Sequence, residues 1–120
     1  MAEYKKYDDG KNRLELIDPE FILGVGKVLT FGAEKYEADN WKNATWEDRQ
    51  KSAGSLLRHT MAYQGGEMID PESGLEHLYH MATNIMFMAW YDRNLVNPNP
   101  RHTMNDSKGQ TYMEVYHGSK

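Results

Sequence analysis

The feature that most constrains this chain is a helix-start signal that occurs along it more than once. Asp18-Pro19-Glu20 and Asp70-Pro71-Glu72 each place an N-cap side chain before a proline and an acid, which is the residue order of a first helical turn. Thr45, with an acid three residues later, resembles a capping box. Apolar residues follow each signal at helical spacing. We expect three helices: Pro19 to Gly32, Thr45 to about Tyr63 with a stop at Gly65-Gly66, and about Pro71 to Arg93.

Composition narrows the class of protein. A chain of 120 residues suffices for one domain with a modest core, and 39% hydrophobic residues with a net charge of −4 indicate a globular rather than a disordered chain. The absence of cysteine excludes disulfides, thiolate zinc sites and cysteine nucleophiles. No apolar run approaches the roughly 18 residues that span a membrane, and Met1–Gly10 has no signal-peptide core. We therefore expect a cytoplasmic protein without membrane contact.

The charge balance also bears on partners. Duplex nucleic-acid binding depends on a basic face, so the acidic balance argues against stable nucleic-acid binding. A nucleotide substrate stays possible, because a bound metal ion can neutralise its phosphates.

The chain divides into a helical domain, residues 1–96, and an irregular C-terminal arm, residues 97–120, which is rich in proline and glycine. Within the arm, Thr111–Tyr116 could form a short strand or pack on a partner. Three helices provide few core residues for a monomer. We therefore expect a helical bundle completed by oligomerisation, as a homodimer or homotetramer.

The residue pattern of the third expected helix predicts that two of its sides are buried. An apolar stripe that can face a core contains Leu75, Leu78, Ala82, Ile85 and Ala89. Nearly opposite lie His77, His80 and Asn84, whereas the expected solvent face contains Glu76, Tyr79 and Thr83. The polar trio either reaches phosphate, metal or water, or satisfies its own hydrogen bonds between packed helices.

Acidic residues just before this helix are candidate metal ligands. Glu67, Asp70 and Glu72 could bind a hard divalent cation, although Asp70 and Glu72 also suit helix capping. Glu34 and Glu37, spaced i and i+3, share a face if their stretch is helical. They could form half of a metal site or a solvated turn.

Cationic and aromatic residues are candidate nucleotide contacts. Lys35 and Arg58 could hold phosphates, and Tyr36 or Trp41 could stack on a base. Core packing is the alternative for Trp41. No Walker loop or dinucleotide fingerprint is present.

Several stretches together resemble one phage-rich family, the dATP/dGTP diphosphohydrolase N-terminal domain family, which includes MazZ-type enzymes. The resemblance covers about Lys11–Arg93. The matching stretches are Lys11–Ile17, Phe31–Tyr36 with Asn40-Trp41, Arg58-His59 with Ala62, and the run from Gly66-Glu67 to Asn84.

The resemblance implies an all-α, MazG-like fold and a Mg²⁺ or Mn²⁺ ion. It implies hydrolysis of a purine (deoxy)nucleoside triphosphate, dGTP or dATP, to the monophosphate and pyrophosphate. The catalytic residues it implies are Glu72, His77, His80 and Asn84. The implied substrate-binding residues are Lys35, Tyr36, Asn40, Trp41, Arg58 and His59. The implied metal ligands are Glu34, Glu37, Glu67, Asp70 and Glu72.

The chain departs from the paired acidic motifs of classical MazG enzymes, because Arg58-His59 and His77/His80 stand near where acids would be. Two alternatives therefore stay open. One is a nucleotide-binding or sensing protein without catalysis. The other is a phage–host interaction module that uses the C-terminal arm.

Overall fold

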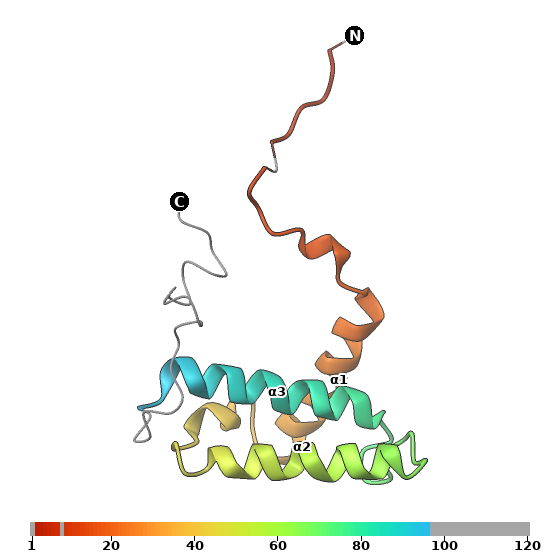
Figure 1. Ribbon diagram of the computed structural model, residues 1–120, viewed down its shortest axis with the longest axis vertical. Helices are drawn as coiled ribbons and strands as arrows, with labels where there is room; N and C mark the ends of the chain where they lie inside the picture. The colour runs from red at the N-terminus through yellow and green to blue at the C-terminus, as the bar shows by residue number, and fades with distance from the viewer. Residues whose placement is uncertain (1, 8, 97–120) are drawn as a thin grey trace.

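Three α-helices form the body of the molecule. The structure is a computed structural model that describes residues 2–7 and 9–96. Its elements are η1 (Leu14–Leu16), α1 (Pro19–Lys35), η2 (Asn40–Asn43), α2 (Arg49–Gln64) and α3 (His77–Asn94). Figure 1 shows α2 and α3 lying side by side, with α1 meeting α3 and the chain before α1 leading away from the helices. The all-α prediction is confirmed for these residues, and the predicted arm, 97–120, lies outside them.

α1 begins where the sequence predicts. The Asp18 carboxylate accepts a hydrogen bond from the Glu20 N–H at 3.2 Å, and Pro19 occupies the first helical position. The predicted stop at Gly32 is wrong, because α1 continues to Lys35. A glycine inside a helix costs only about 1 kcal/mol, and the Gly32 carbonyl accepts the N–H of Tyr36 at 2.9 Å.

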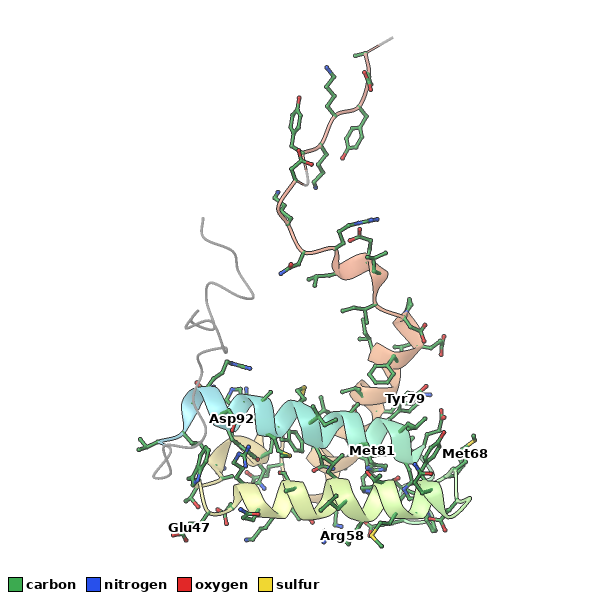
Figure 2. All side chains as sticks on the ribbon, viewed as in Figure 1. Glu47, Arg58, Met68, Tyr79, Met81 and Asp92 are labelled. Atoms are coloured by element: carbon green, nitrogen blue, oxygen red, sulfur yellow. The ribbon has the colours of Figure 1, made fainter. Side chains whose placement is uncertain are left out.

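A single glycine sets the contact between α1 and α3. A Cβ atom on Gly24 would lie 2.5 Å from the ring of Tyr79, so only glycine fits without a shift. Phe21 meets the same ring edge-on, with the centroids 5.6 Å apart. Figure 2 shows Tyr79 where α1 reaches α3. α1 therefore packs with its backbone close to α3.

The start of α2 is a reciprocal cap. The Asp48 carboxylate accepts the Thr45 N–H at 3.0 Å, and the Thr45 hydroxyl accepts the Asp48 N–H at 3.3 Å. The predicted capping box is thus formed, although the regular helix begins only at Arg49. α2 ends at Gln64, and Gly65 follows it as predicted.

The start of α3 differs from the prediction. The helix begins at His77 rather than near Pro71 or Ser73. The backbone groups of the preceding loop form hydrogen bonds with one another instead of continuing the helix. The Asp70 N–H donates to the Leu75 carbonyl at 2.8 Å. The Asp70 carboxylate caps the turn through Ser73 instead of capping the helix. Gly74 completes the turn with a left-handed φ of 72°.

The predicted burial of α3 is confirmed on the side of His77, His80 and Asn84, but it is wrong for the other faces of the helix. In this chain Leu78 and Ile85, from the stripe expected to face the core, are 37% and 55% exposed. Thr83, expected to face solvent, is only 1% exposed, and its hydroxyl donates to the Tyr79 carbonyl. α2 packs on the polar side of α3, so the apolar stripe stays largely open.

The interior of the described chain is consequently polar. Its buried hydrophobic residues are Val28 and Tyr91, and its buried polar residues are Ser52, His77, His80, Thr83 and Asn84. No helix within residues 2–7 and 9–96 combines the length and the hydrophobicity needed to cross a membrane.

Candidate active site

One cavity brings together residues from all parts of the predicted site. It has a volume of about 1000 Å³ and lies between the end of α1, the segment that follows α1, and the inner faces of α2 and α3. The predicted residues that line it are Lys35, Tyr36, Glu37, Asn40, Trp41, Arg58, His59, Glu67, Asp70, Glu72, His77, His80 and Asn84. Glu34 instead borders a smaller cavity beside Phe31, Lys35 and Glu72.

A carboxylate and two imidazoles form a hydrogen-bonded chain. Glu67 Oε1 lies 2.7 Å from His77 Nε2, and His77 Nδ1 lies 2.8 Å from His59 Nδ1. A carboxylate oxygen accepts, so His77 Nε2 carries the proton of the first bond. The two Nδ1 atoms then share a single proton. This chain fixes the orientation of both rings.

A second chain links Asp70, Ser73 and His80. Asp70 Oδ2 accepts bonds from the Ser73 hydroxyl at 2.7 Å and the Ser73 N–H at 3.0 Å. Ser73 Oγ also lies 2.7 Å from His80 Nε2. Since the hydroxyl proton goes to the carboxylate, His80 Nε2–H donates to Ser73. His80 therefore keeps Nδ1 as its basic nitrogen.

The environment favours neutral imidazoles. The rings of His59 and His80 stack at 4.4 Å with an interplanar angle of 5°. Burial lowers the pKa of His59, and His80 beside it lowers it further, whereas Asp70 opposes the change. Burial also lowers the pKa of His80, again against the effect of Asp70. Both rings can thus accept a proton or a cation at neutral pH.

The Asp70 carboxyl is held in its ionised form. Burial alone raises its pKa, but the hydrogen bonds from Ser73 and the neighbouring imidazoles outweigh burial, and the net pKa is lowered. A negative charge therefore stays beside His59 and His80 at neutral pH.

Asn84 joins the two helices that carry the histidines. Its side-chain nitrogen donates to the His80 carbonyl at 2.9 Å and to the Ser55 hydroxyl at 3.2 Å. This finding supports the packing interpretation of Asn84, although the residue also lines the cavity.

The cationic residues lie at the edge of the cavity. Lys35 Nζ forms a 2.8 Å ion pair with Glu72 Oε1, and this bond raises the pKa of the Lys35 ammonium. The pair joins the end of α1 to the loop before α3. Arg58 on α2 is exposed and also lines the cavity.

Trp41 is held in an aromatic cluster. Its ring stacks on Phe87 with centroids 4.7 Å apart, and it meets Trp90 edge-on at 5.3 Å. Its carbonyl accepts the Tyr91 hydroxyl at 2.8 Å. The packing interpretation holds for Trp41, yet it also lines the cavity. Tyr36, by contrast, is largely exposed.

Ser73 and Ser55 are the residues that sequence reasoning missed. Ser73 falls within the matched run between Glu72 and Gly74, but its contact with His80 depends on the turn. Ser55 is one turn from His59 on α2, and no sequence signal distinguishes it from a surface serine.

The potential metal ligands group differently from the expectation. Within the described residues, one group of at least three such side chains is close enough to hold one ion: His59, Asp70 and His77, with one ligand atom of each within 4.8 Å of the others. Glu34 and Glu37 do not share a helical face, because α1 ends between them at Lys35.

The chain is helical, and its cavity of about 1000 Å³ is edged by cations and lined by acids and imidazoles, a size typical of a small-molecule site. The sequence profile of the family described as "dATP/dGTP diphosphohydrolase, N-terminal" matches residues 1–101. The chain belongs to this family.

A relative from Salmonella phage PMBT28, named dATP/dGTP diphosphohydrolase, is 36% identical over 85 residues. That match covers 71% of this chain and 28% of the relative, so the chain spans less than a third of the relative's length. No solved structure matches the chain.

Proposed function

We propose that this chain hydrolyses a purine deoxynucleoside triphosphate, dGTP or dATP, to the monophosphate and pyrophosphate. The observation that carries the proposal is that family-matched segments far apart in the sequence line one cavity of about 1000 Å³. A ligand of nucleotide size suits such a volume.

The triphosphate would lie along the cationic edge. Arg58 is exposed on α2 and can donate to phosphate oxygens in a bidentate manner. The ion pair with Glu72 holds Lys35 near the cavity. A phosphate group could replace Glu72 as the partner of the Lys35 ammonium. Tyr36, whose ring is exposed, and Asn40 line the cavity, and they would contact the base or sugar. Trp41 would act as a wall of the cavity.

The reaction needs a water molecule that loses a proton. The water oxygen forms a bond to the α-phosphorus, the bond from that phosphorus to the bridging oxygen breaks, and pyrophosphate leaves. We assign His80 as the proton acceptor, because Ser73 occupies its Nε2 and burial favours its neutral form. Asp70 orients Ser73 and so acts as a positioning residue.

The proposed ion is Mg²⁺ or Mn²⁺. When bound, it would neutralise phosphate charge and lower the pKa of a water molecule. Mg²⁺ bound to a triphosphate needs only one or two protein carboxylates, and Glu37, Glu67, Asp70 and Glu72 line the same cavity. The donor chemistry is compatible, although these acids do not form a cluster of their own.

Turnover by the purified protein tests the proposal. Each dNTP is incubated with the protein and Mg²⁺, and monophosphate and pyrophosphate are measured. We expect turnover of dGTP or dATP. We expect Arg58→Ala to lower kcat/KM by roughly 10- to 100-fold, because a charge-assisted hydrogen bond contributes about 1.5–3 kcal/mol.

Lys27→Ala is the matched control, since Lys27 is an exposed cation of α1 that does not line the cavity. It should leave kcat/KM unchanged. A folded protein that binds dNTPs without turning over any of them would overturn the proposal in favour of a nucleotide-binding role. Release of triphosphate or of single phosphates would overturn the assigned reaction.

We further propose that the active protein is a homo-oligomer. The support is the open apolar stripe of α3, where Leu78 and Ile85 are exposed while the interior of the chain is mostly polar. Burial of exposed apolar area is the usual driving force of such assembly.

A further inference from the structure

We propose that His59, Asp70 and His77 bind a divalent metal ion such as Co²⁺, Ni²⁺ or Zn²⁺ in preference to Mg²⁺. This site differs in its donors from the all-carboxylate set that the family resemblance implies. It concerns ion binding by the protein alone, so it stands independently of the proposed nucleotide hydrolysis.

The donor set selects the class of ion. Two imidazoles and one carboxylate offer ligand atoms within 4.8 Å of one another. Imidazole nitrogen suits Co²⁺, Ni²⁺ and Zn²⁺, whereas Mg²⁺ prefers oxygen ligands and gives up its water reluctantly. The cluster is therefore poorly suited to Mg²⁺.

The facing imidazoles already share a position for a cation. His59 Nδ1 and His77 Nδ1 lie 2.8 Å apart, with one proton between them. Replacement of this proton by a metal ion requires the nitrogens to move to roughly 3.3 Å apart, as metal–nitrogen bonds of about 2.0–2.1 Å in a tetrahedral site demand. Rotation of the half-buried His59 side chain can provide a shift of that size.

The side chains around the ligands are arranged as at metal sites. A metal-ligating histidine usually donates its other N–H to a carboxylate or carbonyl, and His77 Nε2 donates to Glu67 at 2.7 Å. Asp70 Oδ2 takes both hydrogen bonds from Ser73 and the 3.5 Å contact with His80. The other oxygen of Asp70 is then the one for an ion. The cluster is thus oriented before any ion binds.

The charge of the occupied site suits its place in the cavity. Two neutral imidazoles and one carboxylate would leave a divalent ion with a net charge of about +1. Three protein ligands also leave a coordination position open for water or a phosphate oxygen. The site therefore adds a positive charge to the wall of the cavity that His59, Asp70 and His77 line.

A titration with Co²⁺ tests the proposal without nucleotide. The absorption bands of Co²⁺ in the visible range report its ligands, and they are measured in an excess of Mg²⁺. We expect one Co²⁺ per chain, with bands that Mg²⁺ does not remove. Circular dichroism confirms that each protein used is folded.

Substitutions identify the ligands. His59→Gln and Asp70→Asn should each weaken Co²⁺ binding at least tenfold, and Glu67→Gln should weaken it by roughly 10- to 100-fold through loss of the outer carboxylate. His59→Gln is the most informative variant, because its half-buried position makes folding the least sensitive to change. Glu47→Gln changes an exposed acid that does not line the cavity and should leave binding unchanged.

A double variant, His102→Gln with His117→Gln, removes the histidines outside the described residues. Retention of Co²⁺ binding in this variant would support the proposed site. Loss of binding in it would overturn the proposal, and so would unchanged binding in folded His59→Gln or complete displacement of Co²⁺ by Mg²⁺. Turnover of dNTPs with Mg²⁺ alone, measured separately, decides the proposed function and not this site.

Discussion

Single residues of the cavity gain their chemistry from the atoms they contact. His80 keeps a basic Nδ1 because Ser73 occupies its Nε2, and His59 and His77 share one proton between their Nδ1 atoms. All three residues are histidines, yet the hydrogen bonds to each ring decide which of its nitrogens can accept a proton. The role of each histidine therefore depends on the contacts of its individual ring nitrogens.

Two glycines of α1 allow a matched comparison at this scale. Alanine at Gly24 would place Cβ 2.5 Å from the Tyr79 ring, whereas alanine at Gly26 meets nothing within 4 Å. We expect Gly24→Ala to lower the free energy of unfolding, since overpacking costs about 1–3 kcal/mol and exceeds the helix-propensity gain of about 1 kcal/mol. Chemical denaturation of both variants measures the difference.

Gly26→Ala has the helix-propensity gain without the clash, so it should raise the free energy of unfolding by up to about 1 kcal/mol. Equal effects of the two substitutions would contradict the close contact between α1 and Tyr79.

At the scale of elements, the loop before α3 decides where that helix begins. Ser73 Oγ contacts Asp70, His80 and the Leu75 N–H. These bonds hold the turn against the first residues of α3. They also place the Asp70 carboxylate beside His80, at 3.5 Å.

Ser73→Ala should lower the free energy of unfolding by about 1–3 kcal/mol, because it removes the acceptor of His80 Nε2–H and the hydroxyl bond to Asp70, and leaves only the backbone N–H of residue 73 for Asp70. Urea denaturation measures this loss. Thr30→Ala is the control, since the Thr30 hydroxyl makes only an exposed bond to the Gly26 carbonyl. It should change stability by no more than about 0.5 kcal/mol. A Ser73→Ala variant as stable as the control would show that the turn does not depend on this hydroxyl.

For the whole molecule, the distribution of apolar residues is the main observation. Ile85 is 55% exposed at the middle of α3, whereas Thr83, two residues before it and on nearly the opposite face of the helix, is 1% exposed. A chain with this distribution gains stability when another copy covers the open stripe. The predicted homodimer or homotetramer would provide that cover.

Sedimentation equilibrium tests this prediction. For the unmodified chain we expect a mass of two or four times 13.9 kDa, the mass of a homodimer or homotetramer. Ile85→Lys should lower the mass toward that of one chain, because a lysine in an apolar interface leaves a charge without water. Gln50→Lys adds the same charge at an exposed polar position of α2 and should not change the mass. A single-chain mass for the unmodified protein at micromolar concentration would contradict oligomerisation.

The sequence by itself determined the helical class, the start of α1 and the capping box before α2. These features depend on residues within one turn of each other, such as Asp18 with Glu20 and Thr45 with Asp48. All the site residues that the family signature implied, except Glu34, line the cavity. Local hydrogen bonds and motif spacing depend only on the order of the residues in the chain, so the sequence is enough to predict them.

Only the tertiary structure decided which side of α3 is covered and which donors come together. Helical periodicity defines two faces of α3 but does not state which one α2 will contact. His59 and His77 meet at 2.8 Å because α2 packs on the polar face, and Asp70 joins them because the loop of residues 68–76 folds back on itself. The grouping of imidazole and carboxylate donors, and with it the class of ion that the site favours, depends on these long-range contacts.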